Sequence, residues 1–225
     1  WILAALVVPP ALWLLRFPSP QVEDSDTDGT AAARTHLLIL TLIGLLFFFY
    51  VGAERSIDGW IATYATKSNL ATATRAAYLN SIYWGALTAG RLLSIPLAKR
   101  FAPRAVLTGD LIGCLISVGV MALFREAPWA IWVGTFGMGL SMASIFPTLL
   151  SFAGRQVRVT GRVTGGFFVW ASAGGMSVPW LIGQLFERIG PHVTMFTVLA
   201  DILIAIVIFS VLTVTIRRRK AAKST

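Results

Sequence analysis

Seven long apolar blocks limit what this chain can fold into more than any other feature. The hydrocarbon core of a bilayer is about 30 Å thick, and a helix of roughly 20 apolar residues crosses it. Of the 225 residues, 56% are hydrophobic and 13% are charged, whereas soluble chains carry about 25% charged residues. The sequence therefore predicts an all-α membrane protein. The expected helices are 1–15, 36–64, 75–98, 105–124, 129–152, 162–187 and 191–216.

Basic residues are distributed unevenly over the expected loops. Thirteen of the 19 Lys and Arg residues fall on one side of the expected membrane, in the C-terminal tail and three loops. Lys67, Arg75, Arg125 and Arg188 fall on the other side. Because cytoplasmic loops collect positive charge, we expect the C-terminus, with its basic tail 217–225, to be cytoplasmic. The net charge of +9 is thereby explained without a nucleic-acid partner.

A polar, acidic segment at residues 18–35 separates the first apolar block from the others. Its prolines, glycine and acidic residues are typical of a flexible cytoplasmic linker. Domain boundaries fall in such linkers. We therefore expect the end of one helix at 1–17, this linker, and a six-helix unit at 36–216. The chain begins at Trp1 inside an apolar block, so we expect a fragment of a larger two-part protein.

Arg91, Asp110 and Asp201 are charged residues that lie well inside expected helices. Arg91 and Asp110 fall at similar depths on consecutive helices, and an unpaired charge at such a depth costs several kcal/mol. We therefore predict an Arg91–Asp110 ion pair that acts as a conformational latch. Asp201 lies near the middle of the last helix. It is either a functional carboxylate, such as a proton site, or a hydrogen-bond partner of a Ser or Thr on a neighbouring helix.

Hydrogen-bonding and aromatic side chains gather early in the helix 75–98. Asn80, Tyr83 and Trp84 could bind a sugar, because sugars take amide and phenol groups on their hydroxyls and an aromatic ring on their C–H face. An aromatic belt at the membrane interface is the alternative. Trp170 is a similar candidate, with packing in the core as its alternative.

Two expected helices contain glycine, proline or other small residues that can weaken a helix or let it pack closely against a neighbour. Gly174, Gly175 and Pro179 predict either a break or a simple proline kink in 162–187, and a broken helix in a bundle is typical of a transporter binding site. The helix 129–152 is rich in small residues, which indicates close helix packing or flexing.

The stretches "FFFYVGAERSIDGWIATYA" and "YLNSIYWGALTAGRLLSIPLAKRF" resemble the start of the C-terminal half of a major facilitator superfamily transporter. Within that superfamily the chain is similar to the fucose permease-like sugar symporters and the sodium-dependent glucose transporters. The likeness rests on Tyr50, Val51, Gly52 and Glu54, and on "SIFPT" and "GG…P" further along.

This resemblance implies the C-terminal six-helix bundle of a twelve-helix fold, preceded by the end of the sixth helix. It implies a secondary transporter that moves a sugar or similar small polar solute by alternating access, coupled to a proton or sodium. The expected partners are the solute, the coupling ion, an N-terminal six-helix half and the lipid bilayer. Helices 36–64, 75–98, 129–152 and 162–187 would line the cavity, with 105–124 and 191–216 outside it.

The resemblance suggests roles for the charged residues that follow Tyr50. Arg55 and Asp58, spaced i and i+3, are expected to form a solvated pair. Glu54 is expected near the outer edge of the bilayer, facing the inside of the bundle as an outer gate or substrate contact.

Other classes of protein fit less well. A seven-helix receptor and a non-transporting membrane scaffold are the alternatives. The chain shows no nucleophile–base pair, no cluster of metal ligands and no phosphate-binding loop, so we expect no enzyme, no metal and no cofactor.

Overall fold

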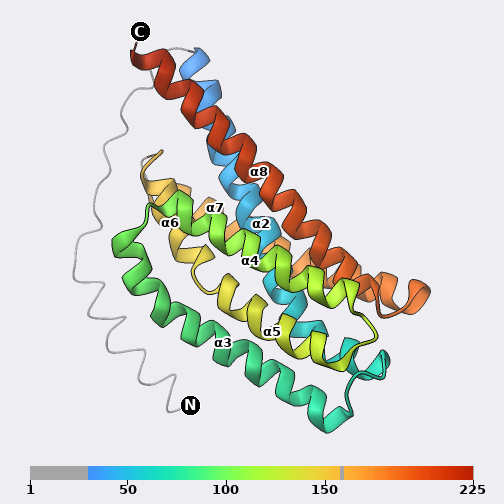
Figure 1. Cartoon of the computed structure of the whole chain (residues 1–225). Coiled ribbons are helices and arrows are strands. Elements are labelled where there is room, and N and C mark those ends of the chain that lie inside the picture. Colours follow the sequence, from blue (N-terminus) through green and yellow to red (C-terminus); the bar gives the residue numbers. More distant parts are fainter. Residues whose placement is uncertain (1–29, 158–159, 225) are drawn as a thin grey trace, which may run out of the picture. The chain divides into compact units, whose positions relative to one another are not determined.

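The computed structural model describes residues 30–157 and 160–224. The chain divides into two units, Trp1–Ala33 and Arg34–Thr225, and the helical bundle belongs to the second. The expected helix end at 1–17 and the linker residues 18–29 lie outside the described residues. Regular structure in the described ranges is helical, as expected (Figure 1): α2 (Thr30–Lys67), α3 (Ala73–Arg100), α4 (Pro103–Leu123), α5 (Pro128–Met142), α6 (Ile145–Gly154), α7 (Gly161–Ile189) and α8 (Val193–Ser224).

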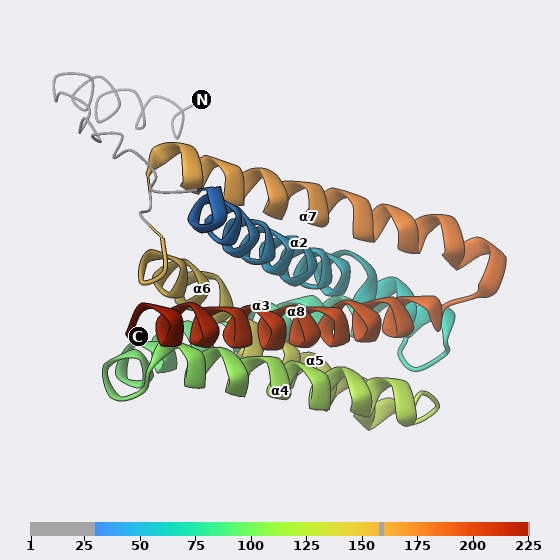
Figure 2. The ribbon, with the colours of Figure 1, turned by 90° about the horizontal axis from the view of Figure 1, so that it is seen from above.

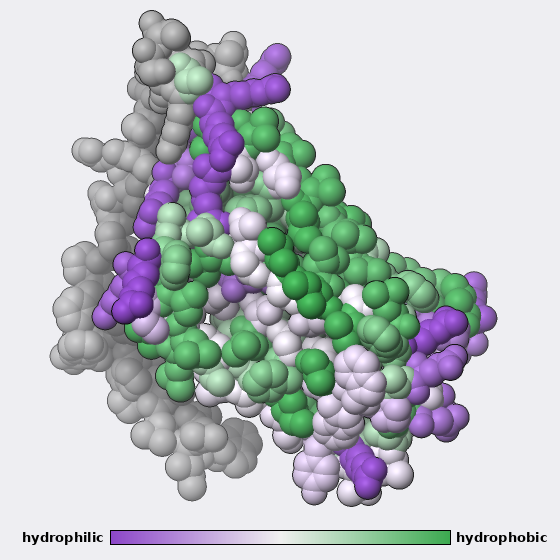
Figure 3. Space-filling model, viewed as in Figure 1, coloured by the Kyte–Doolittle hydropathy of each residue, from purple (hydrophilic) through white to green (hydrophobic). Residues whose placement is uncertain are grey.

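An apolar surface separates polar ends on the bundle. Figure 3 shows hydrophobic side chains over the middle of one face and hydrophilic ones gathered at its edges. Four stretches of the described helices are both long enough and apolar enough to span a membrane. α3 and α7 are long enough, but they are too polar to belong to this group. Those four stretches are His36–Lys67, Pro103–Leu123, Pro128–Gly154 and Val193–Arg219.

α5 lies between α3 and α4 (Figure 1), because its glycines let both neighbours approach closely. A Cβ on Gly139 would collide with the backbone carbonyl of Tyr83 on α3. On the opposite side, a Cβ on Gly134 would collide with Met121 of α4. Small residues allow such close approach, so the close-packing interpretation of 129–152 is confirmed. α3 and α4, although consecutive in the chain, have few direct contacts.

α2 and α7 lie side by side (Figure 2), again through a glycine. Gly174 faces the backbone of Phe48, and a Cβ there would have no room. α7 is continuous over its whole length, with Pro179 inside it. The predicted helix break at Gly174, Gly175 and Pro179 is therefore wrong. The small residues bring two helices together instead of opening one.

The helix that does break is the one expected at 129–152. A turn at residues 143–144 separates α5 from α6. Pro147 explains the position, because a proline has no N–H to donate to the carbonyl four residues earlier, and its ring crowds that carbonyl. Here that carbonyl belongs to Ala143. Close helix packing and helix interruption therefore occur in the same segment.

A phenylalanine cluster joins three helices in the core. The ring of Phe47 on α2 packs edge-on against Phe146 of α6, with centroids 5.1 Å apart, and stacks on Phe167 of α7 at 5.4 Å. Aromatic pairs at such distances add to the free energy of burial. The cluster therefore holds α6 and α7 against α2.

Candidate functional site

A polar hollow of about 560 Å³ opens between four helices. We call it the central hollow. α2, α3, α6 and α7 all contribute to its lining, whereas α4 and α8 do not. This is the set of helices that the sequence analysis expected around a cavity. The lining residues are Tyr50, Val51, Glu54, Arg55, Arg91, Phe146, Phe168, Ala171, Ser172, Gly175 and Met176.

Glu54 is the buried acidic group of the central hollow. Glu54 is 9% exposed, and Tyr50, one turn earlier on α2, also lines the hollow. The positive charges of Arg55 and Arg91 act on Glu54. A carboxylate with nearby cations and a phenol can remain inside a membrane protein at much lower cost than an isolated one.

Glu54 lies well inside α2. α2 begins at Thr30 and continues to Lys67. Glu54 is 13 residues before that end, or about 20 Å at 1.5 Å per residue. It is therefore nearer the middle of the apolar stretch His36–Lys67 than its end. The helix is longer at both ends than 36–64, and the expected position of Glu54 near the outer edge of the bilayer stays a prediction.

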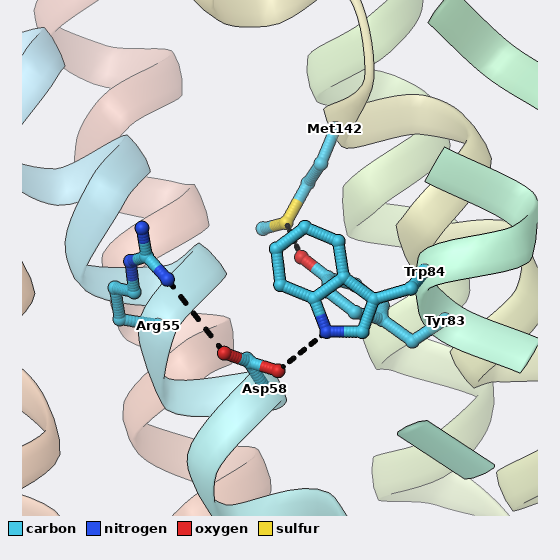
Figure 4. Close-up of polar contacts among 5 residues, drawn as sticks. All are labelled: Arg55, Asp58, Tyr83, Trp84 and Met142. Atoms are coloured by element: carbon cyan, nitrogen blue, oxygen red, sulfur yellow. Dashed lines mark hydrogen bonds and ion pairs between the residues drawn. The ribbon is translucent and has the colours of Figure 1, made fainter. Parts of the chain in front are cut away.

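Arg55 and Asp58 form the predicted pair, and a third residue joins it (Figure 4). The Arg55 guanidinium lies 3.7 Å from a carboxylate oxygen of Asp58. The indole N–H of Trp84 donates to the other oxygen at 2.8 Å. Trp84 therefore ties α3 to α2 beside the central hollow. The pairing of Arg55 with Asp58 was predictable from the sequence spacing, but the partner on α3 was not.

Tyr83 is fully buried and points at the end of α5 (Figure 4). Its hydroxyl donates to the sulfur of Met142 at 3.4 Å. The hydroxyl of Tyr50 donates to the backbone carbonyl of the same Met142, also at 3.4 Å. Two tyrosines thus meet the last residue before the turn at 143–144. They provide polar partners where α5 stops.

The other proposed sugar ligands lie outside the central hollow. Asn80 is half-buried, and its Oδ1 atom has no hydrogen-bond partner in the described part of the chain. Trp170 lies over Gly44 of α2, with its ring 6.5 Å from that of Phe48. Neither residue, nor Tyr83 or Trp84, lines the hollow. Their role in binding a solute stays a prediction.

The predicted Arg91–Asp110 ion pair is not formed in this structure. Asp110 instead accepts a hydrogen bond from the hydroxyl of Ser144 at 2.6 Å, and Arg91 lines the central hollow. The prediction assumed that consecutive helices are neighbours. In the fold α5 lies between α3 and α4, so the two charges face different partners.

Sequence reasoning missed the Asp110–Ser144 contact. Ser144 belongs to the turn between α5 and α6, so Asp110 anchors α4 to the point where the neighbouring helix is interrupted. Pro147 was the available signal. Its clash with the carbonyl of Ala143 points to an interruption at that position, where unpaired polar groups need a partner.

Comparisons with known proteins agree with this architecture. A family model described as Major Facilitator Superfamily matches residues 1–179. Sodium-dependent glucose transporter 1A of Mus musculus is 32% identical over 189 residues, which are 84% of this chain and 44% of that protein. Sodium-dependent glucose transporter 1 of Xenopus laevis is 35% identical over 82% of this chain and 38% of its own length. The chain thus spans less than half the length of these relatives.

A solved structure shares the fold. The crystal structure of the major facilitator superfamily transporter FucP, in the outward conformation, superimposes with a TM-score of 0.68. The alignment covers 97% of this chain and 53% of that chain, at 23% identity. The broken helix formed by α5 and α6 counts as one of the six membrane helices in this architecture.

Proposed function

The chain belongs to the major facilitator superfamily, and we propose that it forms the C-terminal half of a sugar transporter driven by a proton or sodium gradient. The relatives named sodium-dependent glucose transporters support the sugar and the coupling ion. In this proposal the six membrane helices pair with an N-terminal six-helix half, and the solute passes between the halves. A receptor or scaffold finds no support among the relatives.

The central hollow carries this proposal. It combines a buried carboxylate, Glu54, with two arginines and the aromatic walls of Phe146 and Phe168. Charged and hydrogen-bonding groups on apolar, aromatic walls are the usual composition of small-molecule sites. We assign Glu54 to the solute or to the coupling step, because it is the acidic residue that lines the hollow.

The orientation follows from the basic residues. Arg217, Arg218 and Arg219 continue α8 at its C-terminal end. Cytoplasmic ends of membrane helices carry such clusters. The C-terminus and the loops α3–α4 and α6–α7 therefore face the cytoplasm in this proposal, and the loops α2–α3, α4–α5 and α7–α8 face outward.

Uptake of labelled hexoses into vesicles that contain the full-length gene product tests the proposal. We expect uptake that rises several-fold when an inward proton or sodium gradient is imposed, and the effective gradient identifies the ion. Absence of uptake for every hexose under both gradients would remove the sugar assignment. Equal uptake with and without either gradient would contradict coupled transport.

A further inference from the structure

A second hollow, of about 770 Å³, lies between α7 and α8, with a contribution from α2. We call it the α7–α8 groove. Its walls are mainly apolar and aromatic side chains, among them Phe48, Trp180, Leu181, Phe196 and Ile204. It shares no lining residue with the central hollow. The groove is therefore a separate feature of the bundle that the proposed transport route does not use.

One carboxylate, Asp201, lines this apolar groove. The residue is 5% exposed, and its Oδ2 atom has no hydrogen-bond partner among the described residues. The nearby hydroxyl of Ser177 is directed elsewhere, since it donates to the carbonyl of Ala173 at 2.7 Å. The hydrogen bond from a Ser or Thr, one of the two alternatives for Asp201, is therefore not formed at Oδ2 within the described ranges.

The groove supplies no cation close to Asp201. The other titratable residue in its lining is His192, in the turn that precedes α8. Along the helix His192 is nine residues before Asp201, which corresponds to about 13 Å. Asp201 and His192 thus lie well apart along the groove.

These features select one class of ligand. A buried carboxylate is stabilised by an opposite charge that also donates a hydrogen bond. The apolar walls favour an apolar body and disfavour a hydrated ion. A calcium ion takes roughly six to eight oxygen ligands, whereas this lining offers one carboxylate and two hydroxyl groups, those of Ser177 and Thr197.

We propose that the α7–α8 groove binds a lipophilic organic cation, with the ammonium group beside Asp201 and the apolar body against the aromatic walls. The volume lies within the range of known small-molecule sites, about 300–1,000 Å³. Apolar residues of the lining such as Trp180 and Phe196 are themselves more than half exposed, so the groove opens to the surface of the bundle. The site does not depend on the proposed sugar transport.

Three probes of nearly equal shape test this site: 1-adamantylammonium, neutral 1-adamantanol and anionic adamantane-1-carboxylate. Binding is measured by equilibrium dialysis at pH 7 against the protein in lipid nanodiscs, with empty nanodiscs subtracted. We expect saturable binding of the ammonium at least tenfold tighter than that of the alcohol, and no saturable binding of the carboxylate. Equal affinity for ammonium and alcohol, or no saturable binding of the ammonium, overturns the proposal.

Three variants test whether the ammonium probe binds in the α7–α8 groove beside Asp201. Asp201→Asn should lower ammonium affinity to that of the alcohol, whereas Glu187→Gln, which alters an exposed carboxylate on α7, should leave it unchanged. Ala200→Trp fills the groove from an exposed position and keeps Asp201, so it should abolish binding of ammonium and alcohol alike. Unchanged ammonium binding in a folded Asp201→Asn variant contradicts the proposal. If Asp201→Asn does not fold, the Ala200→Trp variant tests the proposal instead. Unchanged ammonium binding by Ala200→Trp would also contradict the proposal.

Discussion

The central hollow and the α7–α8 groove each contain one buried carboxylate, in opposite surroundings. Glu54 lies near Tyr50, Arg55 and Arg91 in a hollow with several polar side chains. Asp201 lies among aromatic and aliphatic walls, and in the described part of the chain it has no hydrogen-bond partner at Oδ2. The carboxylate in the central hollow thus has polar and charged neighbours, whereas the carboxylate in the α7–α8 groove lacks comparable partners among the described residues.

This difference separates two kinds of site. A carboxylate that already has cations and a phenol around it can exchange partners when a polar solute or an ion arrives. A carboxylate without partners favours a ligand that brings its own positive charge. α7 takes part in both hollows, so one helix contributes to the walls of both sites.

Gly174→Leu should produce the largest effect, because it acts on the wall that both hollows share. The added side chain would meet the backbone of Phe48, and overpacking of this kind costs about 1–3 kcal/mol or more. We expect the variant to lose most of its folded, monodisperse fraction in size-exclusion chromatography, and both sites with it. Gly166→Leu is the matched control, since nothing lies within 4 Å of a Cβ there. Equal behaviour of the two variants would show that α2 and α7 are not in close contact.

Ser144→Ala should have an intermediate effect that is confined to the central hollow. It removes the hydrogen bond to Asp110 and leaves a half-buried carboxylate without that donor, at a cost of about 1–3 kcal/mol. We expect a lower midpoint of thermal unfolding and slower solute uptake with unchanged 1-adamantylammonium binding, because α6 lines the hollow and not the groove. Ser210→Ala, which removes a bond to the carbonyl of its own helix, serves as the control. A comparable loss in both variants would mean that the turn between α5 and α6 is not held by Asp110.

Trp84→Phe should have the smallest effect. The ring is retained, and only the indole N–H bond to Asp58 is lost, which is worth about 0.5–1.5 kcal/mol. We expect a shift of a few degrees in thermal unfolding and a two- to threefold rise in the KM for the solute, since Asp58 also holds Arg55. A loss of uptake of tenfold or more would instead make Trp84 a direct ligand of the solute, as its position in the sequence first suggested.

The helical class could be predicted from the sequence, and the cavity-lining helices from the resemblance to a known family, but the interior contacts could not. Hydropathy and helix length depend on local composition, so α2 to α8 fall close to the expected blocks. The Arg91–Asp110 pair failed because it required knowledge of which helices are neighbours, and α5 lies between the two.

The helix break shows the same limit. Glycine and proline both weaken a helix, but their effect depends on what they face. Gly174 and Pro179 lie in a continuous helix packed against α2, whereas Pro147 follows a real interruption. Tertiary contacts determine which of these two helices is continuous and which is interrupted, and such contacts cannot be read from the local sequence.

Gradient-driven sugar uptake by the Glu54→Gln variant tests the central claim most directly. The substitution keeps the size of the side chain and removes its charge, and Glu187→Gln makes the same change at an exposed position. We predict that Glu54→Gln lowers gradient-driven uptake at least tenfold while Glu187→Gln retains it, with both variants folded. Wild-type uptake by a folded Glu54→Gln protein would contradict the assignment of the central hollow as the transport site.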